Sequence, residues 1–128
     1  MVGILIVSSR KQFADTLTSI LEKTEDVTIA TAESGSRGLS LIAEGNAQLV
    51  IADENLTDMT GLAFIEKMTA VNPMINCAAA TSLSDDEFHE ASEGMGVLMG
   101  LPLEPEAEHV ETLLKNFQAI MKLMSGGR

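Results

Sequence analysis

Two side chains with reactive oxygens follow apolar runs in this sequence, the carboxylate of Asp53 and the hydroxyl of Thr81. The runs before them, residues 48–52 and 74–80, are typical of buried strands. In an open α/β sheet, ligands bind just outside the carboxyl ends of the strands, so both residues are candidates for a site. Taken alone, Asp53 fits a turn or a helix cap equally well. No second acid or base follows a strand there, so a hydrolase built on Asp53 is not expected.

The elements that must position these side chains form a regular alternation. Each of five short apolar segments is followed by a segment with helical spacing of its apolar residues. The five expected strands cover residues 3–7, 27–31, 48–52, 74–80 and 97–100. This order predicts a doubly wound α/β fold, in which a five-stranded parallel sheet lies between two helical layers in a (βα)5 three-layer sandwich.

Two helix starts carry the pattern of a capping box, in which the first and fourth residues exchange hydrogen bonds with the backbone. One begins at Ser9 with Gln12, and the other begins at Ser84 with Glu87. Residues 85–87 are all acidic, which suits the positive end of a helix. We therefore interpret them as helix-start residues and not as metal ligands.

Other reactive residue types have structural interpretations. Arg10 and Lys11 could supply a replacement cation to the site, but both fall in the first turn of the first expected helix, where we expect solvated side chains. His89 and His109 have no partners at metal-ligand spacing and are expected to be exposed on helices. Cys77 lies in an apolar run and is expected to be a small buried residue.

Composition excludes several classes of function. The formal net charge of −11 argues against direct binding to nucleic acid or to an anionic membrane, since both need a basic surface. No apolar run has the length of a membrane span. The single cysteine rules out an intramolecular disulfide and favours a reducing, cytoplasmic location. The length predicts one domain over residues 1–124, with 125–128 as a flexible tail or a truncated linker.

The segment from Asp53 to Gly61 resembles the phosphoacceptor segment of bacterial response-regulator receiver domains. The family pattern D-x-x-L-P-x-M-D-G is kept at four positions and changed at two. The kept residues are Asp53, Leu56, Met59 and Gly61, and the changed ones are Thr57 and Thr60. The run that begins at Thr81 is similar to the end of the family's fourth strand, and Leu101-Pro102 falls where the family has Lys-Pro.

This resemblance implies a role for each matching position. Asp53 would be the phosphoacceptor, and the Thr81 hydroxyl would sense the phosphoryl group. Asp53 and the backbone carbonyl of Asn55 would be the remaining ligands for a magnesium ion. A histidine kinase or another signalling protein would be the partner, and a longer chain could carry a kinase or output domain.

The departures from the family are at the positions that do the chemistry. Ser8 and Ser9 stand where the family has an acidic pair, and Leu101 stands where it has a lysine. Leu98 falls at the position of the switch aromatic. Magnesium prefers carboxylate and phosphate oxygens, so its binding is expected to be weak. Losing one preorganised electrostatic contact typically lowers a rate by about two to three decades.

Three functional hypotheses follow. The first is an atypical or pseudo-receiver, a non-enzymatic interaction module that needs no cofactor and has weak or no magnesium-dependent phosphorylation. The resemblance implies that its output surface would be formed by the fourth helix, fifth strand and fifth helix. The second is a working phosphorelay receiver that a histidine kinase phosphorylates on Asp53. The third is a flavodoxin-like cofactor binder with a phosphate near Ser8 and Ser9, which the absence of Trp and Tyr disfavours.

Overall fold

The computed structural model describes residues 2–124 and shows one five-stranded parallel sheet with strand order β2-β1-β3-β4-β5. The strands are β1 Val2–Val7, β2 Val27–Ala32, β3 Leu49–Ala52, β4 Asn76–Ala80 and β5 Val97–Leu101. The helices are α1 Lys11–Leu21, α2 Gly35–Ala43, α3 Gly61–Val71, α4 Asp85–Ala91 and α5 Ala107–Met124. The predicted doubly wound α/β fold is therefore confirmed. The expected tail at 125–128 lies outside the described residues.

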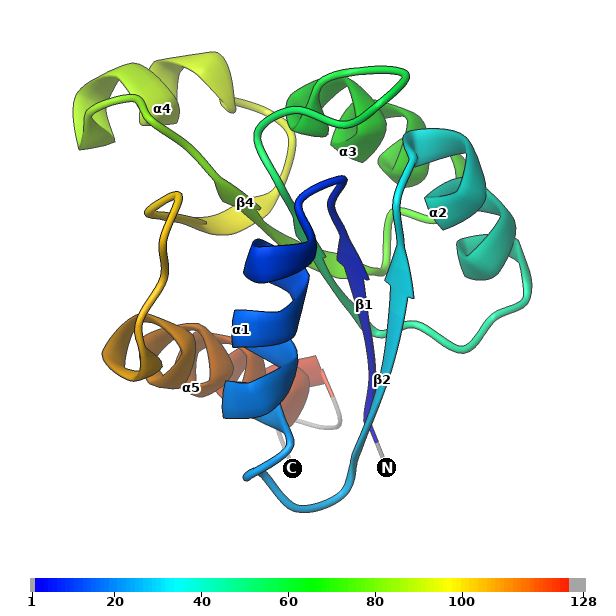
Figure 1. Cartoon of the computed structure of the whole chain (residues 1–128), viewed down its shortest axis with the longest axis vertical. Coiled ribbons are helices and arrows are strands. Elements are labelled where there is room, and N and C mark those ends of the chain that lie inside the picture. The colour runs from blue at the N-terminus through cyan, green and yellow to red at the C-terminus, as the bar shows by residue number, and fades with distance from the viewer. Residues whose placement is uncertain (1, 125–128) are drawn as a thin grey trace.

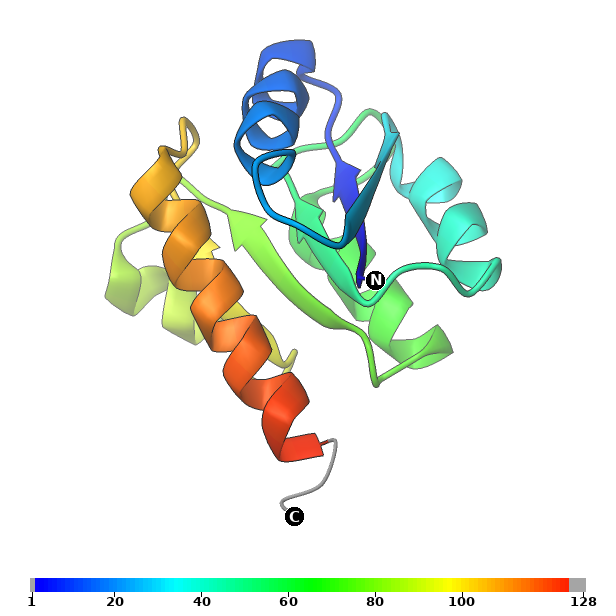
Figure 2. The same cartoon turned by 90° about the horizontal axis from the view of Figure 1, so that it is seen from below.

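The sheet divides the apolar core into two layers. On one face α1 and α5 cover the sheet, and on the other face lie α2, α3 and α4 (Figures 1 and 2). The central strands β1 and β3 are buried on both faces, which explains their continuous apolar sequences. Burying each large aliphatic side chain of these strands contributes about 1.5–3 kcal/mol.

The two edge strands differ in how well they are covered. Strand β2 alternates between half-buried and exposed residues along most of its length. Strand β5 is half-buried from Val97 to Gly100 and fully buried only at Leu101. Helix α4, next to β5, packs on the sheet through Phe88, its one buried residue. Both edge strands therefore keep part of their surface accessible, β2 more than β5.

Side-chain caps fix several of the helix starts. The predicted capping box of Ser84 and Glu87 is confirmed at α4. Helix α2 is capped by Ser34, and the Asp58 carboxylate also accepts the Gly35 and Ser36 N–H groups, at 2.8 and 3.0 Å.

The capping box predicted for Ser9 and Gln12 was wrong. Helix α1 begins one residue later, with Arg10 as its N-cap and without a side-chain cap. The reason lies in the residue before Ser9. The Ser8 hydroxyl oxygen accepts the Arg10 backbone N–H at 2.9 Å. This hydrogen bond forms a turn just before the helix, and the helix starts after it.

Candidate functional site

The end of β3 places Asp53 at the centre of the sheet's carboxyl edge. Strands β1 and β4 flank β3, so Ser8 and Thr81 follow the strands on either side. Asp53 is 2% exposed and is one of two buried polar residues in the described chain, the other being Ser8. Gly61 begins α3 against this strand end, where a Cβ atom would overlap the carbonyl oxygen of Asp53. Only glycine therefore allows α3 to start so close to the site.

Arg10 forms a bidentate ion pair with Asp53. Its Nε donates to Asp53 Oδ2 at 2.7 Å, and its Nη2 donates to Asp53 Oδ1 at 2.8 Å. The Ser8 hydroxyl donates to Oδ2 at 2.7 Å, and the Glu54 backbone N–H donates to Oδ1 at 2.8 Å. Each carboxylate oxygen thus has two donors. Charge-assisted fork geometry of this kind is among the strongest hydrogen bonding that proteins make.

Arg10 keeps part of its side chain exposed, but the expectation that it is only a solvated residue was wrong, because it supplies the cation at Asp53. Its guanidinium lies 4.8 Å from the centroid of the Phe13 ring, and its Nη2 also donates to the Leu103 carbonyl oxygen at 3.0 Å. Arg10 therefore connects the end of β3 to the loop between β5 and α5. Lys11 behaves as expected, because it forms only an exposed pair with Asp15. One signal could have found the pairing: with Leu101 at the family's lysine position, Arg10 is the nearest cation in sequence to a strand end.

The electrostatics of the pair keep Asp53 ionised. Burial raises the pKa of the Asp53 carboxyl, but hydrogen bonds from Arg10, Ser8 and the Glu54 backbone more than offset that effect. The net result is a pKa below the usual range of an aspartate. The same hydrogen bond to Asp53 raises the pKa of Arg10. The site therefore holds a fixed negative and a fixed positive charge in direct contact at neutral pH.

Glu54, the next residue, directs its carboxylate to the turn after β4. Its Oε2 accepts the Ser82 backbone N–H at 2.7 Å and the Ser82 hydroxyl at 2.9 Å. The Thr81 hydroxyl donates to the same oxygen at 3.4 Å and accepts the Leu83 N–H at 3.0 Å. The hydroxyl of Thr81 thus has Glu54 as its acceptor. Asp53 and Glu54 thus connect the β3–α3 loop to the β1–α1 loop and to the β4–α4 loop.

The remaining predicted positions have clear locations. Leu101 is 1% exposed and packs in the core at the end of β5. Leu98 is half-buried on the same strand and lines a cavity beside α4. Ser9 is exposed in the loop after β1, and Asn55 forms an isolated bridge with Thr60 across the β3–α3 loop.

The residues present do not fit a magnesium site. Two hydroxyl side chains, Ser8 and Ser9, stand where carboxylate ligands would be needed. The Asp53 oxygens are already bound by the Arg10 cation, which a divalent ion would have to displace against charge repulsion. Asp53 is left as the one carboxylate ligand, because Glu54 points to the β4 turn.

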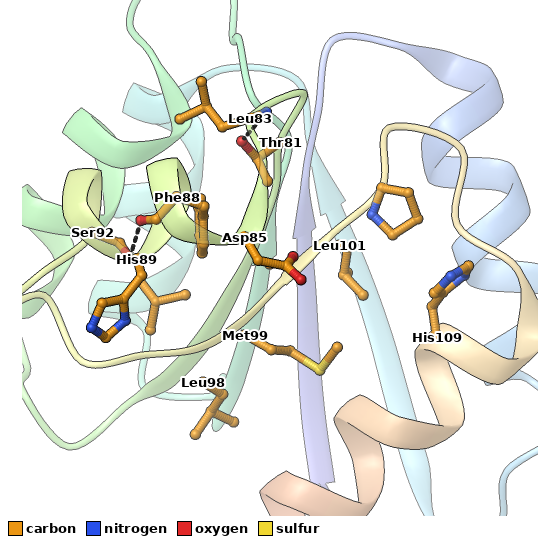
Figure 3. Close-up of a pocket in the computed structure, with 13 residues that line it drawn as sticks. Thr81, Leu83, Asp85, Phe88, His89, Ser92, Leu98, Met99, Leu101 and His109 are labelled. Carbon is orange, nitrogen blue, oxygen red and sulfur yellow. Dashed lines mark hydrogen bonds between the residues drawn. The ribbon is translucent and has the colours of Figure 1, made fainter.

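A cavity of about 530 Å³ lies between α4, β5 and the start of α5 (Figure 3). Apolar side chains from β5 and α4 form much of its wall, and polar residues of α4 and α5 lie among them. The lining residues are Thr81, Leu83, Asp85, Phe88, His89, Ser92, Val97, Leu98, Met99, Gly100, Leu101, Pro102 and His109. His89 is exposed on α4, as expected. His109 is half-buried on α5, so the prediction that it is exposed was wrong.

Comparison with known proteins places this site in a known architecture. The family model of the response regulator receiver domain matches residues 4–99. A response regulator receiver domain protein from Clostridium thermocellum has a TM-score of 0.84 at 18% identity, and the alignment covers 97% of this chain and 99% of that one. A CheY-like receiver domain protein from Methanospirillum hungatei has a TM-score of 0.83 at 23% identity, with 95% and 98% covered.

A third similar structure is the signal receiver domain of an HD domain-containing protein from Pseudomonas fluorescens. It has a TM-score of 0.80 at 22% identity, and the alignment covers 97% of this chain and 90% of that one. At these identities the structures establish the shared fold. Among residues 2–124, no helix has both the length and the apolar character needed to cross a membrane.

Proposed function

Because this chain belongs to the response regulator receiver domain family, we propose that it is an atypical receiver, a pseudo-receiver that signals through protein contacts with weak or no magnesium-dependent phosphorylation. The observation that carries this proposal is the bidentate Arg10–Asp53 ion pair. Arg10 supplies the positive charge at the carboxylate from within the chain. A metal ion is then not needed to neutralise Asp53.

The chemistry of phosphoryl transfer supports the proposal. Transfer to a carboxylate depends on positioning and on stabilising the charge of the moving group. An Asp53 oxygen that already accepts two hydrogen bonds is a poor nucleophile until one donor leaves. Leu101 has no group to donate to a phosphoryl oxygen, and the Thr81 hydroxyl is held by Glu54. In this conformation the attacking oxygen of Asp53 is therefore already hydrogen-bonded, and neither Leu101 nor Thr81 is available to bind the phosphoryl group.

The second candidate function is a receiver that a histidine kinase phosphorylates on Asp53. The observation in its favour is the exposure of the Arg10 side chain, which is 43% accessible although Asp53 is buried. A partner that binds beside α1 could draw Arg10 away from Asp53. Phosphorylation would then require the partner protein, and a small phosphodonor would not suffice.

Intact-mass measurement tests the proposal. The protein is incubated with acetyl phosphate and magnesium, beside Asp53→Asn and Arg10→Ala variants. We expect no added phosphoryl group on the parent protein. Rapid, complete addition to the parent, absent from Asp53→Asn, would refute the proposal and favour the working receiver. If only a histidine-phosphorylated donor protein modifies Asp53, the second candidate replaces the first.

The partners proposed are a histidine kinase or another signalling protein, with cytoplasmic signalling as the setting. The net charge of −11 disfavours direct contact with nucleic acid or with an anionic membrane surface. The contact surface is the face formed by α4, β5 and α5, which holds the cavity of about 530 Å³ and the half-buried edge strand.

A further inference from the structure

The cavity between α4, β5 and α5 lies along one of the two edges of the sheet. Strand β5 is an edge strand, and its residues from Val97 to Gly100 keep part of their surface exposed. Leu98 and Met99 present apolar side chains to the cavity, with Phe88 on the α4 side (Figure 3). An apolar surface next to a cavity of about 530 Å³ has room for a large side chain of another molecule.

The charge around this cavity is strongly one-sided. No Lys or Arg occurs between Lys67 and Lys115, a stretch that includes β4, α4, β5 and the first half of α5. Nine acidic residues lie in it, and all nine are exposed: Asp85, Asp86, Glu87, Glu90, Glu93, Glu104, Glu106, Glu108 and Glu111. The other ten acidic residues share the rest of the chain with all eight Lys and Arg. With nine acidic residues and no Lys or Arg, this stretch accounts for −9 of the formal net charge of −11.

Acidic groups also stand at the cavity itself. The Asp85 side chain projects from the start of α4 into the cavity, toward β5 (Figure 3). On the opposite wall, carboxylate oxygens of Glu106 and Glu108 lie within 4.8 Å of a ring nitrogen of His109. The His109 Nδ1 accepts the Glu106 N–H at 2.9 Å, which fixes the ring at the start of α5. Carboxylates thus stand on both sides of the apolar surface, and no Lys or Arg is among the residues that line the cavity.

We infer that this face binds a basic amphipathic segment of a partner protein, in which a Lys or Arg stands beside a large apolar side chain. The inference rests on the proposed function, since it assumes that the domain works through contact with proteins. The apolar side chain would enter the cavity against Leu98 and Met99. The cation would reach Asp85 while its aliphatic stem covers apolar surface.

Charge complementarity selects this occupant over a second copy of the chain. A symmetric pair formed through this face would bring the acidic segment 85–111 of one copy close to that of the other, and this segment holds no Lys or Arg. Like charges placed against each other disfavour such contacts, and opposite potentials favour encounter with the partner. The partner must therefore supply the positive charge.

The test uses synthetic peptides and the intact protein. The probe is an amphipathic helical peptide of leucine and lysine, and its controls carry glutamate for lysine or serine for leucine. Binding is followed by heteronuclear NMR of the parent protein and of the Asp85→Asn and Met99→Ala variants. Glu25→Gln is the matched control, because it removes one exposed acid outside the 85–111 segment.

We expect the leucine–lysine peptide to shift amides of α4, β5 and the start of α5, and both control peptides to bind at least about tenfold more weakly. Asp85→Asn should weaken binding by about two- to fivefold, with Glu25→Gln unchanged, as for an exposed ion pair. Shifts spread over the whole acidic surface, or equal binding of the serine peptide, would overturn the inference. So would self-association through this face. Phosphorylation of Asp53 would refute the proposed function and leave this result untouched.

Discussion

Replacing Arg10 with alanine removes the cation from a buried carboxylate. Asp53 would keep the hydrogen bonds from Ser8 and from the Glu54 backbone, but it would lose both guanidinium donors. The contact of Arg10 with the Leu103 carbonyl would be lost as well. The β5–α5 loop would then lose the hydrogen bond that connects it, through Arg10, to the end of β3.

The expected cost follows from the burial of the two groups. Breaking a fully buried ion pair by removing one partner costs about 3–5 kcal/mol, because a charge is left without compensation. The Asp53 side chain is 3% exposed, but that of Arg10 is 43% exposed, so water can enter the space that Arg10 leaves. We discount the cost to about 1–3 kcal/mol for this reason. In a domain of this size, that lowers the melting temperature by roughly 3–5 °C per kcal/mol.

The pH dependence of this loss has a definite sign. The folded-state pKa of Asp53 is below its unfolded value, so the stabilisation is fully present above about pH 4 and is lost as pH falls through the folded pKa. In Arg10→Ala the burial of Asp53 is less compensated, and its pKa rises. The difference in unfolding free energy between parent and variant should therefore be largest near pH 7 and shrink below about pH 4.

Urea unfolding of a double-mutant cycle measures the pair itself. The four proteins are the parent, Arg10→Ala, Asp53→Asn and the double variant. Removing the Asp53 charge should cost less when Arg10 is already absent, and we expect a coupling of about 1–3 kcal/mol. A coupling below about 0.3 kcal/mol would show that the two side chains are not paired in solution and would refute the reasoning.

Three further predictions concern the neighbourhood of the site. Glu54→Ala should speed hydrogen exchange of the Ser82 amide by a few-fold, because the amide loses its acceptor. Glu54→Gln keeps an acceptor and should restore most of the protection. Equal exchange in all three proteins would contradict the Glu54–Ser82 hydrogen bond. Gly61→Ala should destabilise the protein by about 2–3 kcal/mol, because its Cβ would press on the Asp53 carbonyl oxygen; an unchanged melting temperature would show that α3 can shift freely. Burial raises the pKa of Cys77 to about 11, so at pH 8 the native thiol should react with an aromatic disulfide only on unfolding, and immediate reaction would contradict its burial.

The fold was predictable because its signals are local and repeated. Continuous apolar runs identify buried parallel strands, and β3 and β5 fall within a residue of their expected bounds. Strand β4 begins later than expected, at Asn76, because Met74 is 62% exposed and lies in the loop before it. The apolar character of Met74 alone does not tell a buried strand from an exposed loop.

The site was predictable in position but not in its contacts. The strand-end rule located Asp53 and Thr81, since it depends only on where strands stop. The Arg10 pair depends on a rotamer and on a turn through Ser8, and neither leaves a periodic pattern. A cation expected in the first turn of a helix normally faces solvent, but Arg10 is the N-cap of α1 and pairs with Asp53, a buried carboxylate that would be costly to leave without a partner.

A magnesium titration followed by heteronuclear NMR tests the central claim most directly. If Arg10 holds Asp53 as the structure shows, millimolar magnesium should leave the amides of Ser8, Asp53 and Asn55 unmoved, with the same result in Asp53→Asn. Saturable shifts at these three amides in the parent, absent from Asp53→Asn, would mean that the metal displaces Arg10. The chain would then be a metal-binding receiver, which contradicts the assignment of Arg10 as the resident cation of the site.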